Sequence, residues 1–575
     1  MRSTRSGRIA ACTALALAAG MLLSGTSASA AEKPVPAPRV DRSQADVRPT
    51  GTKPQAPSTK AAARTTAATP LAPLFDVSGD GWSDMVYRGL SGRSYLKDFT
   101  GDDPEYFVDG AAAGSGYGED FKDVITAGDL NRDGQPELLT LSVHGKLSLL
   151  AANSAGTYRT GWSGNGWNIY NKVVGVGDLT GDGKADLLAR TYAGGLYLYP
   201  GNGTADSGSP FGARISLGAG WNAFSQIVGG GDFNADGKAD LLVATPGGVL
   251  YVYPGNGAGG FGNRIKSGTG WNVYNQLQTL VTNADGGGTW VAARDSAGII
   301  WSYKANADGS LGDRVKMGTS WEYTDLFAGQ GGVPAHGRSE LVGRTSGGAV
   351  YYYGGKMNGG FYDRQEALGS GEAPINQVGM TVTSSFGSLN QAAWLFWGGG
   401  KLYINGAYAG AGWDVFNSLS GVGDINGDGF GDLLARDKSN VMWFYPGNGS
   451  GTSFGNRVRL GAGWGIYNKL FGAGDVTGDG RADLLARGTD GSLWAYPGNG
   501  TTSFGDRVKI GDAGWNGFKK LTAVGDITGD GRTDLVGVNS AGTAFVYKAS
   551  GLKGLNTFQG NTNIGGGWNA YAELH

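Results

Sequence analysis

Cysteine is almost absent from this chain of 575 residues: Cys12 is the only one. It lies in an amino-terminal segment that we expect to be removed, so disulfide bonds and cysteine-ligated metals are excluded from the remainder. Histidine is also scarce, with only His144, His336 and His575. The sequence has no G-x-S-x-G or H-E-x-x-H motif, so the common serine-hydrolase and zinc-protease signatures are missing.

Long apolar runs are missing beyond the amino terminus, where none approaches the roughly 20 residues that a membrane-spanning helix needs. No run of basic residues interleaves with aromatic residues. We therefore expect neither membrane insertion nor nucleic-acid binding.

The first 73 residues differ in composition from everything that follows. Residues 1–30 contain three arginines, then an apolar run over 9–23, and small residues before Ala30. This order predicts a signal peptide and a secreted, extracellular protein. Residues 31–73 are rich in Pro, Ala and Thr and poor in large apolar side chains, which predicts a disordered linker.

Residues 74–575 repeat with a period near 50. GDLTGDGKADLLAR at 177–190 recurs as GDINGDGFGDLLAR at 423–436 and as GDVTGDGRADLLAR at 474–487. Short apolar runs bounded by Gly, Asn and Pro then follow in each unit and predict about four antiparallel strands. Ten such units predict an all-β fold, a β-propeller with one unit per blade, while a β-helix would need shorter rungs.

The number of rings is left open by this pattern, because ten blades exceed the usual four to eight. A single large ring and two five-bladed rings both fit. The folded part begins with a loop that lacks its preceding strand (73–81) and ends with a strand that lacks its following loop (565–575). We expect the two ends to complete one blade together, which would leave no open sheet edge.

Seven units contain an acidic loop of the form D-x-[TSN]-x-D-G-x-x-[DE] or a close variant. Oxygen donors stand at loop positions 1, 3, 5 and 9, an alternation that can direct successive oxygens at one hard cation. The last carboxylate is at position 9, not at position 12 as in an EF-hand, and strands flank the loop. We expect about seven Ca²⁺ sites that stabilise the fold. The predicted ligands are Asp76, Ser78, Asp80, Asp84; Asp129, Asn131, Asp133, Glu137; Asp178, Thr180, Asp182, Asp186; Asp232, Asn234, Asp236, Asp240; Asp424, Asn426, Asp428, Asp432; Asp475, Thr477, Asp479, Asp483; and Asp526, Thr528, Asp530, Asp534.

Calcium would reverse the charge of the protein. Without residues 1–30 and their three arginines, the formal net charge falls from −2 to −5, and seven Ca²⁺ would raise it to +9. A cationic protein would favour anionic partners such as cell-wall polysaccharides.

The acidic loop followed by LLAR resembles the FG-GAP repeat of integrin α-chain propellers and the related VCBS repeats of secreted bacterial proteins. The resemblance extends over residues 74–575 and implies calcium in the seven loops. Units over about 281–400 depart from it, because 281–290, 331–341 and 384–394 lack the carboxylate set. Some lectins and modules of wall hydrolases are similar, which implies glycan binding.

A second recurring motif is GWN or a close variant, followed by an aromatic residue. Indole faces can stack on sugars and the neighbouring amide can bond hydroxyl groups, so the motif could form a multivalent sugar site. Packing between blades is the alternative, and it is the favoured one for the tryptophans. The candidate ligand residues are Trp167, Asn168, Trp221, Asn222, Trp271, Asn272, Trp515, Asn516, Trp568 and Asn569; Trp321, Trp413 and Trp464 occupy the same position.

Two further repeated motifs are expected to be structural. The FGxR arginines and their equivalents predict ion pairs between blades, and the YPGNG segments predict connections between strands. These residues are Arg214, Arg264, Arg314, Arg364, Arg457 and Arg507, and Tyr199, Tyr253, Tyr445 and Tyr496.

These observations favour a non-enzymatic binding module for carbohydrate or cell-wall polymer. Every conspicuous aspartate belongs to the repeated loop, whereas an active site is usually an asymmetric exception. The exceptions here lie in the irregular middle units, which include His336 and Glu340. A calcium-dependent polysaccharide lyase, a glycosidase and a protein adhesion module remain the alternatives.

Overall fold

The computed structural model describes residues 48–54, 71–89, 94–99, 105–106, 121–142, 145–152, 158–191, 193–204, 208–284, 287–328, 340–356, 358–369, 379–383, 393–428, 430–477, 481–528, 532–550 and 554–575. The predicted signal peptide, most of the predicted linker, His144, His336, Asp479 and Asp530 lie outside the described residues. Within the described part, no helix is both long and apolar enough to cross a membrane.

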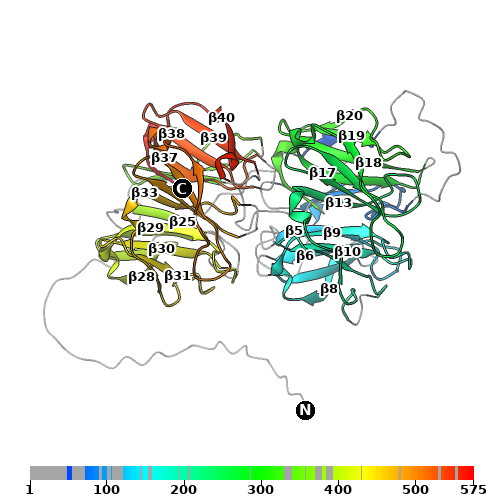
Figure 1. The fold of residues 1–575 in the computed structure, drawn as a ribbon, viewed down its shortest axis with the longest axis horizontal. Helices are drawn as coiled ribbons and strands as arrows, with labels where there is room; N and C mark the ends of the chain where they lie inside the picture. The colour runs from blue at the N-terminus through cyan, green and yellow to red at the C-terminus, as the bar shows by residue number, and fades with distance from the viewer. Residues whose placement is uncertain are drawn as a thin grey trace, which may run out of the picture. The chain divides into compact units, whose positions relative to one another are not determined.

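The described residues form ten antiparallel sheets, each with four strands of one blade (Figure 1). Second strands such as Asp186–Thr191 are apolar on both faces and almost wholly buried, whereas third strands such as Leu196–Tyr199 alternate buried Leu with half-buried Tyr. This pattern is typical of sheets that stack face to face. The predicted β-propeller of ten blades is confirmed.

Five sheets form the first ring, in which the innermost strand of each blade is named first. Its blades are β21 (Thr324–Phe327), β2 (Met85–Gly89), β3 (Ser94–Lys97), β4 (Glu105–Tyr106); β5 (Phe121–Gly128), β6 (Glu137–Ser142), β7 (Leu147–Ala152), β8 (Tyr158–Gly164); β9 (Tyr170–Gly177), β10 (Asp186–Thr191), β11 (Leu196–Tyr199), β12 (Ile215–Ser216); β13 (Gln226–Gly231), β14 (Asp240–Ala244), β15 (Leu250–Tyr253), β16 (Ile265–Gly268); and β17 (Tyr274–Thr282), β18 (Gly288–Asp295), β19 (Ile300–Lys304), β20 (Val315–Thr319).

The other five sheets form the second ring. Its blades are β41 (Tyr571–Leu574), β22 (Glu340–Thr345), β23 (Val350–Gly354), β24 (Gln365–Leu368); β25 (Gly379–Thr383), β26 (Ala393–Gly398), β27 (Lys401–Ile404), β28 (Ala407–Ala411); β29 (Phe416–Gly423), β30 (Asp432–Asp437), β31 (Met442–Tyr445), β32 (Val458–Gly461); β33 (Tyr467–Gly472), β34 (Leu484–Gly488), β35 (Leu493–Tyr496), β36 (Val508–Gly511); and β37 (Phe518–Ala523), β38 (Leu535–Asn539), β39 (Ala544–Ala549), β40 (Phe558–Asn563).

Each ring is closed by its own last strand. β21 pairs with β2 in the first ring, and the terminal β41 pairs with β22 in the second. The expectation that the two ends of the folded chain share one blade is therefore wrong. The chain completes the first ring at residue 327 and begins the second at residue 340, within the units that lack acidic loops.

The cores lie between blades, with one apolar cluster at each junction. In the first ring, Ile125 of β5 packs with Val173 of β9, and Phe327 of β21 lies in one cluster with Leu280 of the preceding blade. Five further clusters lie at the junctions of the second ring. Four connect blades that follow one another in the chain, and the fifth, which contains Val536 and Leu341, joins the last blade to the first. Burial of apolar surface between neighbouring sheets thus stabilises both rings all the way round.

Short 3₁₀ turns precede the innermost strands and begin at the tryptophan of the GWN motif. They are η1 (Trp167–Ile169), η2 (Trp221–Ala223), η3 (Trp271–Val273), η4 (Trp321–Tyr323), η5 (Trp413–Val415), η6 (Trp464–Ile466), η7 (Trp515–Gly517) and η9 (Trp568–Ala570); η8 (Gly554–Asn556) is unrelated.

Part of the predicted linker is ordered. β1 (Thr50–Gly51) pairs with the outer edge of β20, which makes that blade five-stranded. The indole N–H of Trp321 donates to the Thr50 carbonyl at 3.0 Å, and Arg48 lies over the Tyr95 ring at 4.8 Å. The prediction of disorder fails for this stretch because composition does not reveal an available sheet edge.

Removal of β41 tests the closure of the second ring. A chain that ends at Ala570 loses the partner of β22 together with the buried side chains of Tyr571 and Leu574. We expect the unfolding transition of the second ring to fall by more than about 10 °C, while that of the first ring is unchanged. Differential scanning calorimetry measures both. Ala572→Ser, at an exposed position of β41, is the control; equal losses in both rings would contradict independent closure.

Candidate functional site

The acidic loops occupy one structural position. Six of them join the innermost strand of a blade to its second strand, and the loop at 76–84 leads directly into β2. Because all second strands begin at the same end of their blades, the loops of each ring lie at one end of that ring.

The carboxylate at loop position 9 is buried in every acidic loop. Glu137, Asp186, Asp240 and Asp432 are fully buried. In the loop at 178–186, Asp186 accepts the N–H groups of Leu179 and Thr180 at 2.9 Å and that of Gly201 at 2.8 Å. Gly201 belongs to the YPGNG segment, so one side chain links the loop to the connection between the third and fourth strands.

This linkage recurs in other blades. Asp240, Asp432 and Asp483 accept the equivalent glycine N–H at 2.8–3.0 Å, and Asp534 accepts that of Ala549 at 3.1 Å. The YPGNG tyrosines end β11, β15, β31 and β35, as expected of connecting segments.

Position 1 organises the turn itself. Asp178 accepts the N–H groups of Gly181, Asp182 and Gly183 at 2.6, 3.1 and 2.7 Å. The glycine at position 6 has φ of +82°, which a residue with a Cβ rarely adopts. The backbone therefore wraps around a carboxylate.

The loop at 129–137 brings three predicted ligands together. The ligand oxygens of Asp129, Asp133 and Glu137 all lie within 4.8 Å of one another. Oε1 of the fully buried Glu137 has no hydrogen-bond partner. Among the residues that the structure describes, no other acidic loop gathers three carboxylates this closely. At position 3, however, the hydroxyl groups of Thr477 and Thr528 are likewise buried without a partner.

Burial makes these carboxylates weak acids. It raises the pKa of Asp84, Glu137 and Asp240 to about 7 and that of Asp432 to about 8, with neighbouring acidic side chains adding to the effect. Such groups are costly to ionise until a cation compensates their charge.

The loop at 76–84 forms an ion pair with a lysine from outside the repeat. Lys53, from the ordered stretch of the predicted linker, forms an ion pair with Asp80 at loop position 5. Sequence reasoning missed this contact because Lys53 lies outside the repeat.

The GWN tryptophans are packing residues. Trp167, Trp221, Trp271 and Trp568 are at most 8% exposed, and each indole lies 4.7–4.9 Å from a tyrosine of its own blade. Trp515 is half-buried against Tyr547 at 4.9 Å. The hypothesis of an open sugar-stacking face is therefore wrong for the four buried tryptophans, which are packing residues as the alternative interpretation expects.

The asparagines of the motif are exposed but lie against the preceding blade. The Asn222 side chain packs on Gly194, in the hairpin turn between β10 and β11, so closely that a Cβ added to this glycine would come within 2.8 Å of it. Asn516 donates to the Thr489 carbonyl at 3.1 Å. Asn168, Asn272 and Asn569 lie against the equivalent glycines.

The arginine of LLAR is a structural residue that sequence reasoning did not single out. Arg190 donates to the carbonyl groups of Trp221 and Phe224 in the next blade, at 3.0 and 2.7 Å. Burial lowers its pKa to about 10. We call the set the blade-lock arginines, and they make the same contacts with the following 3₁₀ turn: Arg190, Arg294, Arg436 and Arg487. The sequence feature that could have identified these arginines is the recurrence of a charged residue inside an otherwise apolar strand.

The FGxR arginines do not form the predicted ion pairs. Within the described residues no salt bridge involves them. Each guanidinium instead lies 4.2–4.6 Å from the centre of a tyrosine or tryptophan ring on the third strand of its blade.

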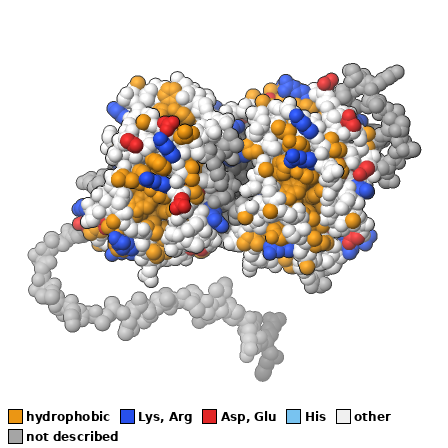
Figure 2. Space-filling view, viewed as in Figure 1, with side chains coloured by type: hydrophobic (Ala, Val, Ile, Leu, Met, Phe, Trp, Pro, Cys, Tyr) orange, Lys and Arg blue, Asp and Glu red, His pale blue; other side chains and the backbone are white. Residues whose placement is uncertain are grey.

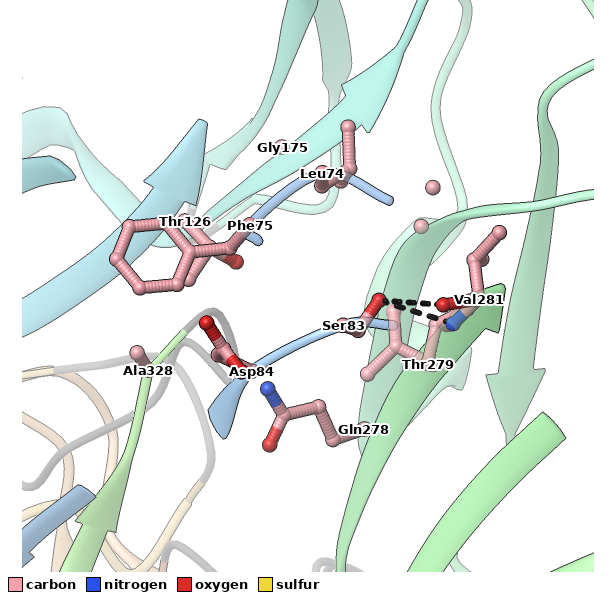
Figure 3. A pocket seen from close by; sticks show the side chains of 13 residues that line it. Leu74, Phe75, Ser83, Asp84, Thr126, Gly175, Gln278, Thr279, Val281 and Ala328 are labelled. Carbon is pink, nitrogen blue, oxygen red and sulfur yellow. Dashed lines mark hydrogen bonds between the residues drawn. The ribbon is translucent and has the colours of Figure 1, made fainter. Parts of the chain in front are cut away.

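A small pocket lies at the centre of the first ring (Figure 3). Thr126, Gly175, Gly229 and Gln278 line it from four innermost strands, and Leu74 lies over it. Its volume is about 30 Å³, enough for water but not for a sugar ring.

In the second ring, an ionic group sits on the closing strand. Glu573 pairs with Arg344 at 2.9 Å and accepts the N–H of Met380 at 3.2 Å, while His575 Nε2 lies 3.6 Å away. These contacts join three neighbouring elements, β41, β22 and β25. His575 therefore belongs to a group of side chains that hold the closing strand in place. Glu340 is the first residue of β22.

Comparison with known proteins finds FG-GAP-like repeats in four overlapping segments, 129–189, 178–243, 424–486 and 475–537. No curated protein matches the sequence. Among solved structures, the BP39L lectin from Burkholderia pseudomallei is 13% identical over 77% of this chain and 100% of its own, with a TM-score of 0.25. BBS1N, in complex with ARL6DN, is 13% identical over 54% of this chain and 86% of its own, with a TM-score of 0.20.

The raised pKa values predict how metal-free protein responds to pH. Between pH 4.5, the ordinary pKa of glutamate, and about pH 7, the folded state retains the proton on Glu137, whereas the unfolded chain has released it. The free energy of unfolding contributed by this group therefore decreases as the pH rises through this window. We expect thermal unfolding in chelator to show this loss.

Two amide variants sharpen the pH test. Glu137→Gln should raise the free energy of unfolding at pH 8 by about 1–3 kcal/mol and have little effect near pH 4. The amide oxygen of the glutamine can still accept the Leu130 N–H, and its NH₂ group can occupy the place of Oε1, which has no partner. Asp432→Asn should destabilise at both pH values, because both of its oxygens accept backbone N–H groups. Identical behaviour of the two variants would contradict this assignment.

The blade-lock arginines are tested at Arg294, which is fully buried. Arg294→Met removes the guanidinium that donates hydrogen bonds to the carbonyl groups of Trp321 and Thr324. We expect a loss of about 2–4 kcal/mol in the free energy of unfolding, measured with denaturant. Arg459→Met, at an exposed position, should change it by less than about 0.5 kcal/mol; a similar loss there would contradict the lock.

Proposed function

Because this chain carries FG-GAP-like repeats, we propose that it is a secreted calcium-binding β-propeller protein that acts as a non-enzymatic binding module for carbohydrate or cell-wall polymer. In this proposal calcium binds to the acidic loops, and the polymer binds to surfaces that recur from blade to blade. The signal peptide predicted over 1–30 supports secretion.

The observation that supports calcium most strongly is the donor set at 129–137. Three carboxylates converge there, and one of them has a buried oxygen without a partner. Oxygen donors in a tight loop suit a hard cation such as Ca²⁺. Asp129, Asp133 and Glu137 would hold the ion together with the Asn131 amide oxygen, and the corresponding positions would do so in the other six loops.

Bound calcium would supply positive charge where carboxylates are crowded and desolvated. The chain itself already positions the donors, because backbone N–H groups hold Asp178 and Asp186 in place. Ion binding to the folded state alone would add stability that a chain without disulfides in its folded part needs. Calcium is thus a structural clip in this proposal, and the binding surface lies elsewhere.

Repetition supports a binding role on an extended ligand. Side chains of the same kind recur at the same position in several blades, as the exposed Asn168, Asn222 and Asn272 of the first ring illustrate. A polymer with repeating units can occupy several equivalent positions at once, so weak individual contacts add to a high overall affinity. An array of like positions suits binding better than catalysis, which needs one distinct site.

Calcium binding is tested by counting sites. Isothermal titration calorimetry of the metal-free protein should give about seven sites, and thermal stability should rise in millimolar calcium. Asp182→Asn should remove one site, because its charge is lost while Oδ1 still accepts the Lys184 N–H. Asp414→Asn, an exposed aspartate outside the loops, is the control. Absence of binding and of any stabilisation would overturn the proposal.

The binding role is tested on an array of glycans and cell-wall polymers in calcium and in excess chelator. We expect retention of at least one polymer class in calcium, with weaker retention in chelator as the rings lose stability. The chain length of a bound polymer should stay constant over hours. Shortening would establish a lyase or glycosidase instead, and no retention by folded protein would favour a protein partner.

A further inference from the structure

An exposed arginine lies at the outer rim of six blades, immediately before the fourth strand. Each belongs to the FGxR motif or its equivalent, and each guanidinium stacks on a half-buried aromatic ring of the third strand. We call these the rim arginines, with their rings: Arg214 on Tyr197, Arg264 on Tyr251, Arg314 on Trp301, Arg364 on Tyr351, Arg457 on Trp443 and Arg507 on Trp494.

Stacking fixes the guanidinium without neutralising it. Arg214 lies 4.5 Å from the Tyr197 ring centre and donates one hydrogen bond, 2.7 Å long, to the Tyr170 hydroxyl. Arg507 donates to the Tyr467 hydroxyl at 2.6 Å. Such a contact leaves other N–H donors directed toward solvent in a fixed plane. An anion that binds there meets an arginine whose side-chain entropy is already lost.

A second cation stands beside four of these stacks. In the fourth strand, the residue two positions after the rim arginine pairs directly with the aromatic residue: Lys266 with Tyr251, Lys316 with Trp301, Arg459 with Trp443 and Lys509 with Trp494. Side chains of directly paired residues share one face of a sheet, and so do residues two apart. Both cations therefore flank one ring, and both are exposed.

Acidic neighbours distinguish the sites from one another. Lys509 pairs with Asp512 at 2.7 Å, and an aspartate directly precedes Arg314, Arg364 and Arg507. In contrast, Asn263 precedes Arg264 and Asn456 precedes Arg457. Within the described residues, no salt bridge involves the Arg264–Lys266 or the Arg457–Arg459 pair. The carboxylate next to the second pair, Asp437, accepts the Trp443 indole N–H at 3.0 Å.

We propose that the cation pairs Arg264–Lys266 and Arg457–Arg459, each built on an aromatic ring, bind the anionic groups of an acidic polysaccharide. The assignment deepens the proposed binding function and rests on it. A stacked guanidinium offers a planar fork that matches carboxylate or sulfate oxygens, and the neighbouring cation adds charge. Lys and Arg side chains lie at separate points over the face drawn in Figure 2 and not in one block, which suits charges spaced along a polymer.

The charge of the loaded protein agrees with this occupant. Seven Ca²⁺ would give the chain without residues 1–30 a formal charge of +9, which attracts polyanions over several ångströms at low salt. A neutral polysaccharide gains nothing from either source of charge. Discrimination between acidic and neutral polymers is therefore the property that the rim predicts.

The experiment compares immobilised hyaluronan, dextran sulfate, neutral dextran and poly(dT) by biolayer interferometry, with the whole mature protein in calcium. The test variant is Arg264→Gln, Lys266→Gln, Arg457→Gln, Arg459→Gln. Its matched control carries Lys146→Gln, Lys401→Gln, Lys438→Gln and Lys519→Gln, which remove the same charge at exposed positions elsewhere. Thermal unfolding checks that both variants are folded.

We expect wild-type protein to bind an acidic polysaccharide at least tenfold more tightly than dextran, and more weakly when salt is raised from about 50 to about 300 mM. The test variant should lose at least tenfold in affinity and the control less than threefold. Arg264→Lys with Arg457→Lys keeps the charge but loses the planar fork, and should lose about threefold or more.

Other results overturn the inference in separable ways. Equal losses in test and control variants would mean that net charge alone binds the polymer, and unchanged affinity of the test variant would place the site elsewhere. Binding of poly(dT) as tight as that of hyaluronan would overturn the polysaccharide assignment. Retention of neutral dextran by every variant would leave the proposed function standing without this site, whereas wild-type protein that binds no polymer would overturn the function itself.

Discussion

Both rings depend on the hydrogen bonds that fix each blade to the next. Apolar side chains between sheets supply most of the burial, but they do not by themselves set the angle between neighbouring blades. At four junctions a blade-lock arginine such as Arg190 does so, because its guanidinium must reach two carbonyl groups of the following 3₁₀ turn. The same turn is held from its other side by the Trp221 N–H, which donates to the Gly194 carbonyl at 3.0 Å. Each tryptophan that begins such a turn donates its N–H to the hairpin turn of the preceding blade in the same way, which gives the GWN motif a structural reason to recur.

The acidic loop performs the corresponding task within a blade. Its position-9 carboxylate joins the loop to the connection that follows the third strand, as Asp186 does with Gly201. Burial of this group makes its ionisation costly, which is why the pKa of Asp432 is raised to about 8. Two repeated polar devices thus account for the two most regular motifs.

The sequence predicted the blades far better than it predicted their surroundings. Strand positions, the number of blades and the loop positions follow from a period near 50 residues and from local turn chemistry. Ring closure could not be predicted, because whether β41 pairs with β22 or with β2 depends on long-range pairing that leaves no local signal. For the same reason, β1 was hidden in a stretch with a linker's composition. Indole exposure at Trp221 and the partners of Arg264 depend on side chains from other strands, so their roles needed the structure.

Closure of each ring by its own last strand has a consequence for how such a chain can be rearranged. Both arrays start with the second strand of a blade, at β2 and β22, and finish with an innermost strand, at β21 and β41. A segment that begins and ends at the same phase can be duplicated, deleted or fused to another protein as one cassette, without leaving an unpaired strand at either junction. A cut at any other phase would split a sheet. The unit that can be moved without splitting a sheet is therefore the five-blade array, not the fifty-residue repeat from which it is built.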